Sequence, residues 1–473
     1  MNDITAIFAF LKYCLGYKRN MSRMIAGMDW QELYSFASKQ ALLGLSFEGI
    51  ERLGKEYPEE LKQNPIGREL LMTWMGKAQQ IRRQNMKVNA VAGKLFSMLR
   101  EDGLRCCILK GQGNALIYPN AYSRNPGDID VWVNASRERI MEYAQKKFEL
   151  GDDIRLQHLE TSLDGVPVEL HFFPCSMNNP IYHARLQKWF RRNADLQCSH
   201  IVGLPDGAGD IAIPTTAFNV VYQLTHLYHH FFDEGIGMRQ IIDYYYVVCD
   251  FYKVYQNSSK ITPSLFFDKA SCTRQFESEL SLHSLASLFP LKEGSTSHPD
   301  PLTLRGEGGN RPTRCSEPLR SKDGGPSKVS PDCAGWDRLS IEGDNSAGST
   351  TVVTSYASTA LDVAQRELKY LGLWKFAGAV MYVLKEVLGL SEDKMIVPVD
   401  EKRGRLLLAE ILDGGNFGRH FTKYAGFTHQ SMGKKYFLKI WRNMHFVRYY
   451  PAEALCEPLF RTWHFFWRLK YKK

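Results

Sequence analysis

Apolar residues recur every three or four positions over much of the chain, which is the spacing of one buried face of an α-helix. This spacing predicts a helical N-terminal lobe over residues 1–95, ending in a long helix around 77–101. Asp29 is a typical N-cap within this lobe. The same spacing returns over residues 215–251 and 361–390, so we expect helices there as well.

The period changes to two between residues 104 and 200, which favours β-strands. Residues 106–109 form a short apolar run, and residues 129–133 follow a Gly-Asp turn. Downstream, apolar and polar residues alternate, with one face made by Val166, Val168, Leu170 and Phe172 and the other by Glu169 and His171. We therefore predict an α/β core over residues 96–205.

The composition changes abruptly over residues 291–350, where Gly, Pro and Ser make up 24 of 60 residues. Such a segment cannot build an apolar core, and this favours disorder. We predict a disordered insertion over 256–358, arising either from inserted or frame-altered DNA or from a lineage-specific linker. It divides a helical C-terminal lobe into residues 206–255 and 359–473.

The strongest chemical signal is the run Gly127-Asp128-Ile129-Asp130-Val131. Alternate side chains of a strand share a face, so Asp128 and Asp130 are expected side by side. Two adjacent carboxylates repel unless a cation lies between them, and Mg²⁺ takes carboxylates together with phosphate oxygens. A bare acidic triplet also occurs by chance in solvated turns, so its surroundings decide the interpretation.

Those surroundings add two further features. The apolar run 106–109 ends at Lys110-Gly111-Gln112, a turn that could offer backbone N–H groups to a phosphate. Glu169 supplies a third carboxylate from a later strand, as a two-metal site requires. Together these features suggest metal-assisted phosphoryl or nucleotidyl transfer.

The same residues resemble a known family. Leu109-Lys110-Gly111, Tyr118-Pro119, Arg124, the strand 126–130 and the run 168–171 are similar to uncharacterised bacterial nucleotidyltransferases of the polymerase-beta superfamily. The resemblance covers roughly residues 80–250 and resumes around 360–390. It implies an α+β fold: a polymerase-beta-like core with a small mixed sheet and flanking helices, plus N- and C-terminal helical lobes. One departure is Gln112, which stands where that superfamily has a small hydroxyl residue after the glycine.

The resemblance implies transfer of a nucleoside monophosphate from a nucleoside triphosphate to a hydroxyl acceptor, with release of pyrophosphate. Asp128, Asp130 and Glu169 would be the catalytic residues and would hold Mg²⁺ or Mn²⁺. Lys110, Gly111, Gln112 and Arg124 would contact the nucleotide. The acceptor remains open among small molecules, sugars, proteins and RNA. The alternatives are an inactive nucleotide-binding or regulatory protein, or an adaptor that acts on nucleic acid or a membrane surface.

Composition adds the cellular setting. Ten cysteines are scattered without metal-binding spacing, and Cys106-Cys107 lie in an apolar run, which favours buried thiols in a reducing compartment. We see no signal peptide and no apolar span of membrane length. These observations predict a cytoplasmic protein, with a membrane-peripheral location as the alternative.

The C-terminal tail, residues 434–473, carries ten Lys and Arg against two Glu, interleaved with twelve aromatic residues. Basic and aromatic residues together suit single-stranded nucleic acid, and they equally suit an anionic membrane interface. A helix that packs its aromatic residues on the core and leaves its cations solvated is the third interpretation.

Several other polar residues allow two interpretations. His226, His229 and His230 share a helical face and suit either a transition metal or packing against the core. His171 suits either the site itself or a supporting hydrogen bond. Arg124 is either a triphosphate contact or a solvated loop residue, and Arg239 is spaced for an ion pair with Asp243.

Overall fold

A five-stranded mixed sheet carries the polar residues singled out above. The computed structural model describes residues 3–18, 20–256, 349–421 and 432–471, which belong to one compact unit. The strands of the sheet lie in the order β1-β2-β5-β4-β3. Only the pair β2–β5 is parallel. The strands are β1 (Cys106–Leu109), β2 (Ile129–Val133), β3 (Leu150–Ile154), β4 (His158–Leu163) and β5 (Val166–His171).

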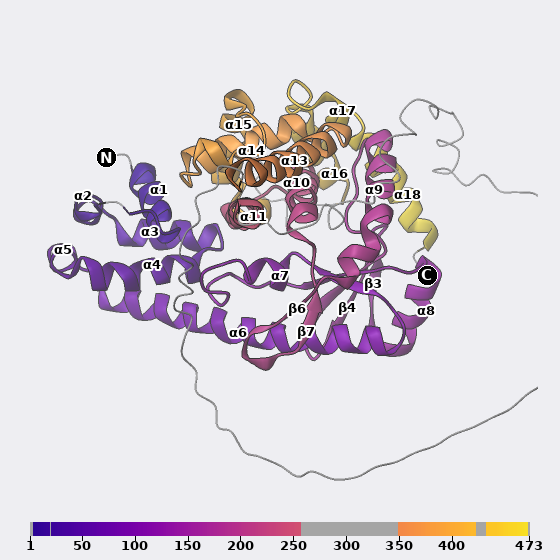
Figure 1. Ribbon diagram of the computed structural model, residues 1–473, viewed down its shortest axis with the longest axis horizontal. Helices are drawn as coiled ribbons and strands as arrows, with labels where there is room; N and C mark the ends of the chain where they lie inside the picture. The colour runs from indigo at the N-terminus through magenta and orange to yellow at the C-terminus, as the bar shows by residue number, and fades with distance from the viewer. Residues whose placement is uncertain (1–2, 19, 257–348, 422–431, 472–473) are drawn as a thin grey trace, which may run out of the picture. The chain divides into compact units, whose positions relative to one another are not determined.

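One face of this sheet is covered by the long helix α6 (Arg68–Glu101), with α8 (Arg137–Lys147) beside it. Figure 1 shows α6 running beneath the strands. Alternation along β2 turns Ile129, Val131 and Val133 toward α6, and all three are buried. Helix α6 begins at Arg68, earlier than the predicted 77, and Gly103, whose φ is +73°, follows its end.

The opposite face of the sheet is covered by the helices α7 (Gly111–Ala115), α9 (Pro180–Ser199) and α10 (Thr216–Asp233). Trp132 of β2 points to this side, where its ring contacts Phe190 of α9 and Phe218 of α10. Asp130 lies two residues earlier on the same strand and therefore faces the same layer. A short hairpin of β6 (Ile201–Gly203) and β7 (Asp210–Ala212), with η1 (Pro205–Gly207) between them, joins α9 to α10.

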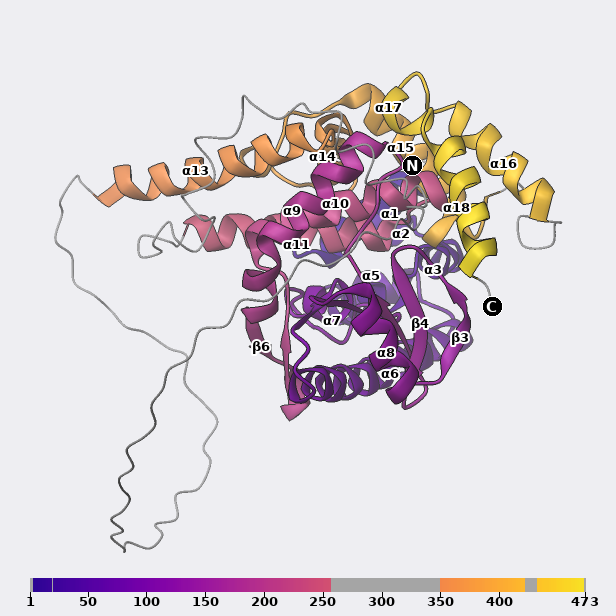
Figure 2. The same cartoon turned by 90° about the vertical axis from the view of Figure 1, so that its right-hand side faces the viewer.

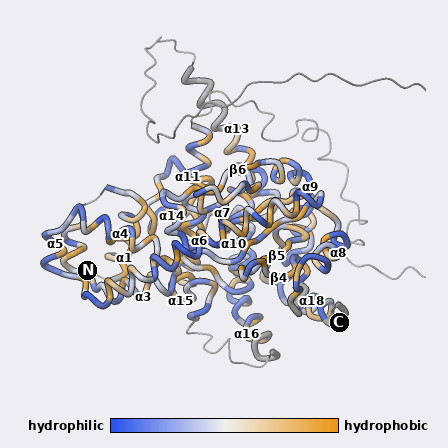
Figure 3. The backbone as a smooth tube through the Cα atoms, turned by 90° about the horizontal axis from the view of Figure 1, so that it is seen from below, coloured by the Kyte–Doolittle hydropathy of each residue, from blue (hydrophilic) through white to orange (hydrophobic). Residues whose placement is uncertain are grey.

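The N-terminal lobe is helical, as predicted. Asp29 caps the third helix by accepting hydrogen bonds from two backbone N–H groups. The lobe consists of α1 (Asp3–Cys14), α2 (Ser22–Ala26), α3 (Trp30–Lys39), α4 (Leu43–Glu56), α5 (Pro58–Gln63) and much of α6. In Figure 3 the peripheral helices α5 and α8 are mostly hydrophilic.

The predicted helix over 215–251 is two helices, because Gly235 and Gly237 interrupt it. Gly235 has a φ of +102°, and a Cβ on Gly237 would collide with the backbone of Asn416. Helix α11 (Met238–Gln256) follows this break, and the chain is described again from α13 (Ser349–Tyr370). The helices predicted over 361–390 are the end of α13 and α14 (Trp374–Glu386). Figure 2 shows α10, α11, α13 and α14 on the side of the sheet away from α6.

The remaining elements are η3 (Glu392–Lys394), α15 (Glu401–Gly414), η4 (Asn416–Gly418), α16 (Met432–Met444), α17 (Pro451–Ala454) and α18 (Glu457–Tyr471). In the tail, Lys439 and Arg461 form ion pairs with Asp233 of α10, so these two cations are not simply solvated. Several large apolar side chains of the tail are exposed, among them Phe437, Trp441, Leu459 and Phe466. No described helix is long and apolar enough to cross a membrane.

The predicted α+β architecture, with a small mixed sheet flanked by helices, is confirmed. The cysteines Cys106 and Cys107 are buried free thiols, as expected. Of the predicted insertion 256–358, residues 257–348 lie outside the described residues, and residues 349–358 belong to α13. The predicted domain boundaries stay predictions.

Candidate functional site

Strand register brings the predicted carboxylates together on one face of the sheet. Asp130 is the register partner of Glu169 across the parallel pair β2–β5, and Leu109 is its partner on the other side. Lys110 and Gly111 follow Leu109 directly, so the turn after β1 reaches the same place. The structure therefore assembles Lys110, Asp130 and Glu169 from three neighbouring strands.

Asp128 precedes β2 and is exposed, whereas Asp130 is buried. The charge of Asp130, followed by burial and the charge of Glu169, raises the pKa of Asp128 to about 6. Burial would also raise the pKa of Asp130, but the Lys110 ammonium and His171 hold it well below its usual value. The two carboxylates thus repel one another, and Lys110 and His171 form ion pairs with Asp130 rather than with Asp128.

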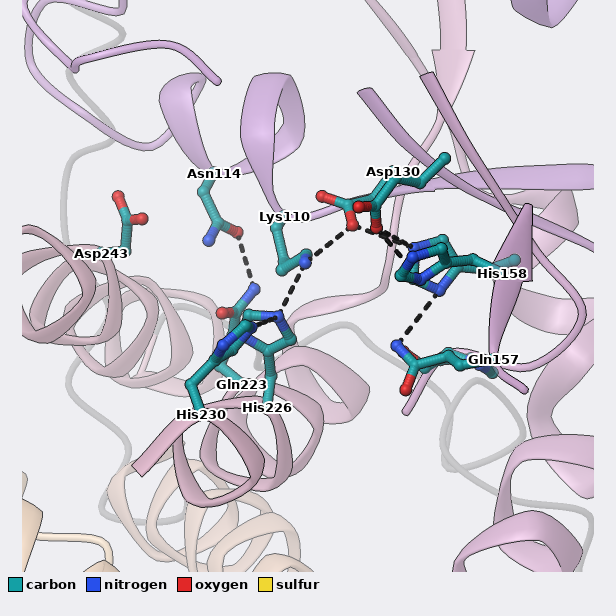
Figure 4. A network of polar contacts seen from close by, with 12 residues as sticks. Lys110, Asn114, Asp130, Gln157, His158, Gln223, His226, His230 and Asp243 are labelled. Atoms are coloured by element: carbon teal, nitrogen blue, oxygen red, sulfur yellow. Dashed lines mark hydrogen bonds and ion pairs between the residues drawn. The ribbon is translucent and has the colours of Figure 1, made fainter. Parts of the chain in front are cut away.

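Lys110 is held between the sheet and α10. Its Nζ lies 2.8 Å from Asp130 Oδ1 and 2.7 Å from His226 Nε2, and His226 Nε2 lies 2.9 Å from His230 Nε2 (Figure 4). Burial lowers the pKa of Lys110, but the nearby carboxylates outweigh it and leave a net rise. Burial and the Lys110 charge keep the pKa of His226 well below its usual value. Lys110 is therefore charged and donates to a neutral imidazole.

The backbone at this turn is in a sparsely populated conformation. Lys110 has a φ of 51° although it carries a side chain, and Gly111 follows with a φ of 27°. A left-handed non-glycine residue costs about 1–3 kcal/mol and persists where the surroundings impose it, often at functional sites. Here the contacts of Lys110 Nζ with Asp130 and His226 fix the conformation.

Glu169 stands between two histidines. Its Oε2 lies 3.1 Å from His171 Nε2 and 3.2 Å from His158 Nδ1, and His171 Nε2 lies 3.0 Å from Asp130 Oδ1. Burial lowers the pKa of His171, but hydrogen bonds to Asp130 and Glu169 raise it to about 9. His171 is consequently protonated at neutral pH and donates to both carboxylates. On its far side, Gln157 Nε2 lies 3.4 Å from His171 Nδ1.

Arg124 is buried, so its interpretation as a solvated loop residue is wrong. Its Nε and Nη2 donate to Asp243 Oδ1 and Oδ2 at 2.8 and 2.9 Å, and Tyr118 donates to the same carboxylate at 2.7 Å. Asp243 therefore pairs with Arg124 rather than with its expected helical neighbour Arg239. Arg239 instead donates to the backbone carbonyl of Asn125.

These side chains line one pocket between the sheet and the helices α10 and α11. Lys110, Gly111, Arg124, Asp128 and Asp130 all lie in its wall. The other lining residues are Gly127, Gln223, His226, Leu227, Arg239, Gln240, Asp243 and Phe417. Lysine, arginine and carboxylate side chains thus face the same space, an arrangement suited to a phosphate ester carried with a metal cation.

Two predicted residues do not line this pocket. The Gln112 side chain is buried and donates to Asn89 of α6, pointing away from the phosphate turn. Glu169 contacts Asp130 through His171 and lies toward β4. The roles assigned to these two residues stay predictions, as do those of the five predicted residues that line the pocket.

Four residues at the site were not assigned to it from the sequence: His158, His226, Arg239 and Asp243. His158 begins β4 and is the register partner of His171. The other three come from α10 and α11, between about 96 and 113 residues after Asp130. Of these four residues, only His158, on the strand that pairs with β5, could have been found from local sequence signals.

Comparison with known proteins gives one match. Residues 26–261 match the model of a family described as uncharacterised nucleotidyltransferase. The matched range contains the whole sheet, the turn at Lys110 and the helices α10 and α11, and the mixed α+β architecture is consistent with a nucleotidyltransferase core. No curated protein and no solved structure matches the chain.

Proposed function

Taking residues 26–261 as a domain of this nucleotidyltransferase family, we propose that the protein transfers a nucleoside monophosphate from a nucleoside triphosphate to a hydroxyl acceptor and releases pyrophosphate. The observation that carries the proposal is the exposed Asp128 beside the buried Asp130, in a pocket that Lys110, Arg124 and Arg239 also line. The acceptor class, among small molecules, sugars, proteins and RNA, is left to experiment.

The donor chemistry of Asp128 and Asp130 fits Mg²⁺ or Mn²⁺. Both offer carboxylate oxygens, and the raised pKa of Asp128, caused first by the Asp130 charge, reflects negative charge that lacks its own cation. When bound there, the divalent ion would neutralise charge that develops on the phosphates as pyrophosphate leaves. Asp128 and Asp130 would hold it, as proposed from the sequence.

Lys110 would meet the triphosphate from a position beside Asp130. Its ammonium sits on a conformationally fixed turn, in contact with Asp130, and its remaining hydrogen-bond capacity can face an anionic ligand. Gly111, which has no side chain, leaves room for the ligand at this turn. Arg124 lines the pocket too, but Asp243 occupies its guanidinium, so it would act mainly by fixing the wall.

Glu169 would assist the acceptor hydroxyl, as a base or by holding a second ion. His171 cannot act as that base while it is protonated, and its pKa of about 9 keeps it so at neutral pH. We assign His171 the role of holding Asp130 and Glu169 in register, since its Nε2 contacts both.

The test compares aspartate variants of the full chain. Asp128→Asn and Asp130→Asn should abolish Mg²⁺-dependent release of labelled pyrophosphate in the presence of cell extract, while circular dichroism remains native. The matched control is Asp164→Asn, in an exposed turn of the same sheet, where only an ion pair with Lys94 is lost. Unchanged turnover in the Asp128/Asp130 double variant would refute the proposal.

A catalytically inactive nucleotide-binding or regulatory protein is a second candidate, favoured by the engagement of Lys110 with both Asp130 and His226. Calorimetry with ATP, CTP and UTP, with and without Mg²⁺, would detect binding without pyrophosphate release. A third candidate, an adaptor working through the tail, is favoured by the exposed Phe437, Trp441 and Phe466. Liposome flotation and RNA gel shift with a 434–473 deletion as control would test it.

A further inference from the structure

His158, Glu169 and His171 form a cluster whose composition differs from the acidic pair beside it. One donor atom from each residue lies within 4.8 Å of the other two. The nitrogens nearest to Glu169 Oε2 are His171 Nε2 at 3.1 Å and His158 Nδ1 at 3.2 Å. These are two imidazole nitrogens and one carboxylate oxygen, gathered from the adjacent strands β4 and β5.

His158 supplies an independent observation. Its side chain is buried, and neither ring nitrogen makes a hydrogen bond within the described chain. The approach of Nδ1 to Glu169 Oε2 is close, but it lacks hydrogen-bond geometry. Buried polar groups normally have a partner, so an imidazole that lies beside a carboxylate with both nitrogens unsatisfied indicates a missing ligand.

From this cluster we infer a second cation site, formed by His158, Glu169 and His171 and specific for a divalent transition metal such as Zn²⁺. Two imidazoles with one carboxylate are the protein donor set of catalytic Zn²⁺ and of non-haem Fe²⁺ sites, whereas Mg²⁺ prefers oxygen ligands alone. The site therefore differs in chemistry from the carboxylate pair Asp128–Asp130.

The spacing suits such an ion. With metal–ligand distances near 2.1 Å, neighbouring donors of a tetrahedral Zn²⁺ lie about 3.4 Å apart. The separations of 3.1 and 3.2 Å from Glu169 Oε2 need an adjustment of only a few tenths of an ångström, and the two imidazole nitrogens, which lie within 4.8 Å of one another, must come to the same spacing. On binding, the ion takes the place of the proton on His171 Nε2, and that proton is released to solvent.

The surroundings would orient the ligands. Gln157 Nε2 lies 3.4 Å from His171 Nδ1, and Ser176 Oγ donates to Gln157 Oε1 at 3.3 Å. A metal-bound histidine donates its second ring N–H, so Gln157 would support His171 with its amide turned to present Oε1. Asp130 Oδ1, 3.0 Å from His171 Nε2, is the adjacent donor on the side of the pocket. The cluster thus borders the pocket proposed to bind the nucleotide. Only this statement about its neighbour rests on the proposed function; the metal site itself does not.

The test titrates Zn²⁺ into the metal-stripped full chain by calorimetry, with Mg²⁺ in excess to occupy oxygen-only sites. We expect one Zn²⁺ per chain, together with a rise in the melting temperature. His158→Ala should weaken binding by at least about 100-fold, since loss of even a supporting partner costs 10–100-fold. His158→Gln, which keeps a polar side chain of similar size, should weaken it as well. The exposed-site control His445→Ala should bind normally.

Substituting Co²⁺ gives a readout that does not depend on activity. Its visible absorption should change in His158→Ala and His171→Ala but not in His445→Ala. The inference is overturned if the native chain binds no Zn²⁺ above excess Mg²⁺. It is equally overturned if binding survives both histidine variants, or is lost with Asp128→Asn or His226→Ala instead. Pyrophosphate release measured with Mg²⁺ alone tests the proposed function separately, so either proposal can fail without the other.

Discussion

Removing Asp243 should destabilise the protein more than any exposed acidic substitution, because it leaves a buried arginine without its counterion. Arg124 donates two hydrogen bonds to Asp243, and Tyr118 donates a third. Both charged side chains are less than a tenth exposed. Breaking a buried ion pair from one side costs about 3–5 kcal/mol, mainly because the remaining charge stays buried.

The measurement is the free energy of unfolding of Asp243→Ala, from urea titration followed by circular dichroism. A loss of about 3–5 kcal/mol would be a large share of the 5–15 kcal/mol typical of a folded domain. The control is Asp164→Asn, which keeps a side chain suited to the positive φ of this turn and removes only an exposed ion pair with Lys94, worth no more than about 1 kcal/mol. Equal losses in the two variants would contradict the argument.

A double variant separates the charge from the packing. Arg124→Met combined with Asp243→Leu removes both members of this ion pair together, so it should be more stable than Asp243→Ala. The pKa of Asp243 is lowered, since Arg124 outweighs the effect of burial. The stabilisation is therefore fully present above the ordinary pKa of an aspartate, about 4, and is lost as the pH falls through the lower folded-state value. Asp243→Asn should lack this acid-side loss.

Two further predictions concern pH. The pKa of Asp128 is raised to about 6, mainly by Asp130, so below pH 6 Mg²⁺ must displace a proton from Asp128. The affinity for Mg²⁺ should therefore fall about tenfold for each pH unit below 6. Calorimetry of Asp128→Asn should show an affinity that does not vary with pH over this range. Burial raises the pKa of Glu453 from 4.5 to about 7, so the folded chain retains a proton that the unfolded chain loses between these values. The contribution of Glu453 to the free energy of unfolding therefore falls by about 3 kcal/mol as the pH rises from 4.5 to 7. Unfolding titrations of Glu453→Gln should lack this fall. The same pH dependence in Glu453→Gln and the native chain would contradict the prediction.

The sheet could be predicted because its information is local. Alternation over 129–133 and 166–171 identifies two strands with one buried face, and it places Asp130 and Glu169 on the face toward α9 and α10. The register Asp130–Glu169 does not follow from alternation, because parallel strands are joined by long connections that leave their relative shift open. The resemblance to a known family supplied that relation.

His158 was within reach of sequence reasoning. Asp164-Gly165 is a strong signal for a two-residue hairpin turn, and both residues have the positive φ that such a turn requires. A two-residue turn pairs residues symmetrically about it, so His158 falls opposite His171 and Glu160 opposite Glu169. The runs His158-Leu159-Glu160 and Glu169-Leu170-His171 are mirror images around this turn.

The helical contribution to the site could not be predicted in the same way. His226, Arg239 and Asp243 reach the pocket because α10 and α11 pack over the sheet, and their helical spacing fits many other packings equally well. The burial of Arg124 has the same origin, since its partner is 119 residues away. These contacts depend on how the apolar faces of the helices pack together. The sequence of one helix alone does not show which polar residues that packing brings into contact.

Charge balance at the pocket leads to the most specific functional prediction. Among the described residues, Lys110 and His171 are the cations in direct contact with Asp130 and Glu169, Asp128 has no ion pair, and Arg124 is paired with Asp243. Two unit charges 4 Å apart near a protein surface interact by about 4 kcal/mol, so a metal-free triphosphate beside Asp128 should lose roughly three orders of magnitude in affinity. Asp128→Asn removes both the repulsion and a metal ligand. It should therefore weaken nucleotide binding in Mg²⁺ but strengthen it in EDTA, relative to the native chain. Calorimetry under both conditions measures this crossover, and weakening by the same factor in both would show that Asp128 acts on the nucleotide without a metal.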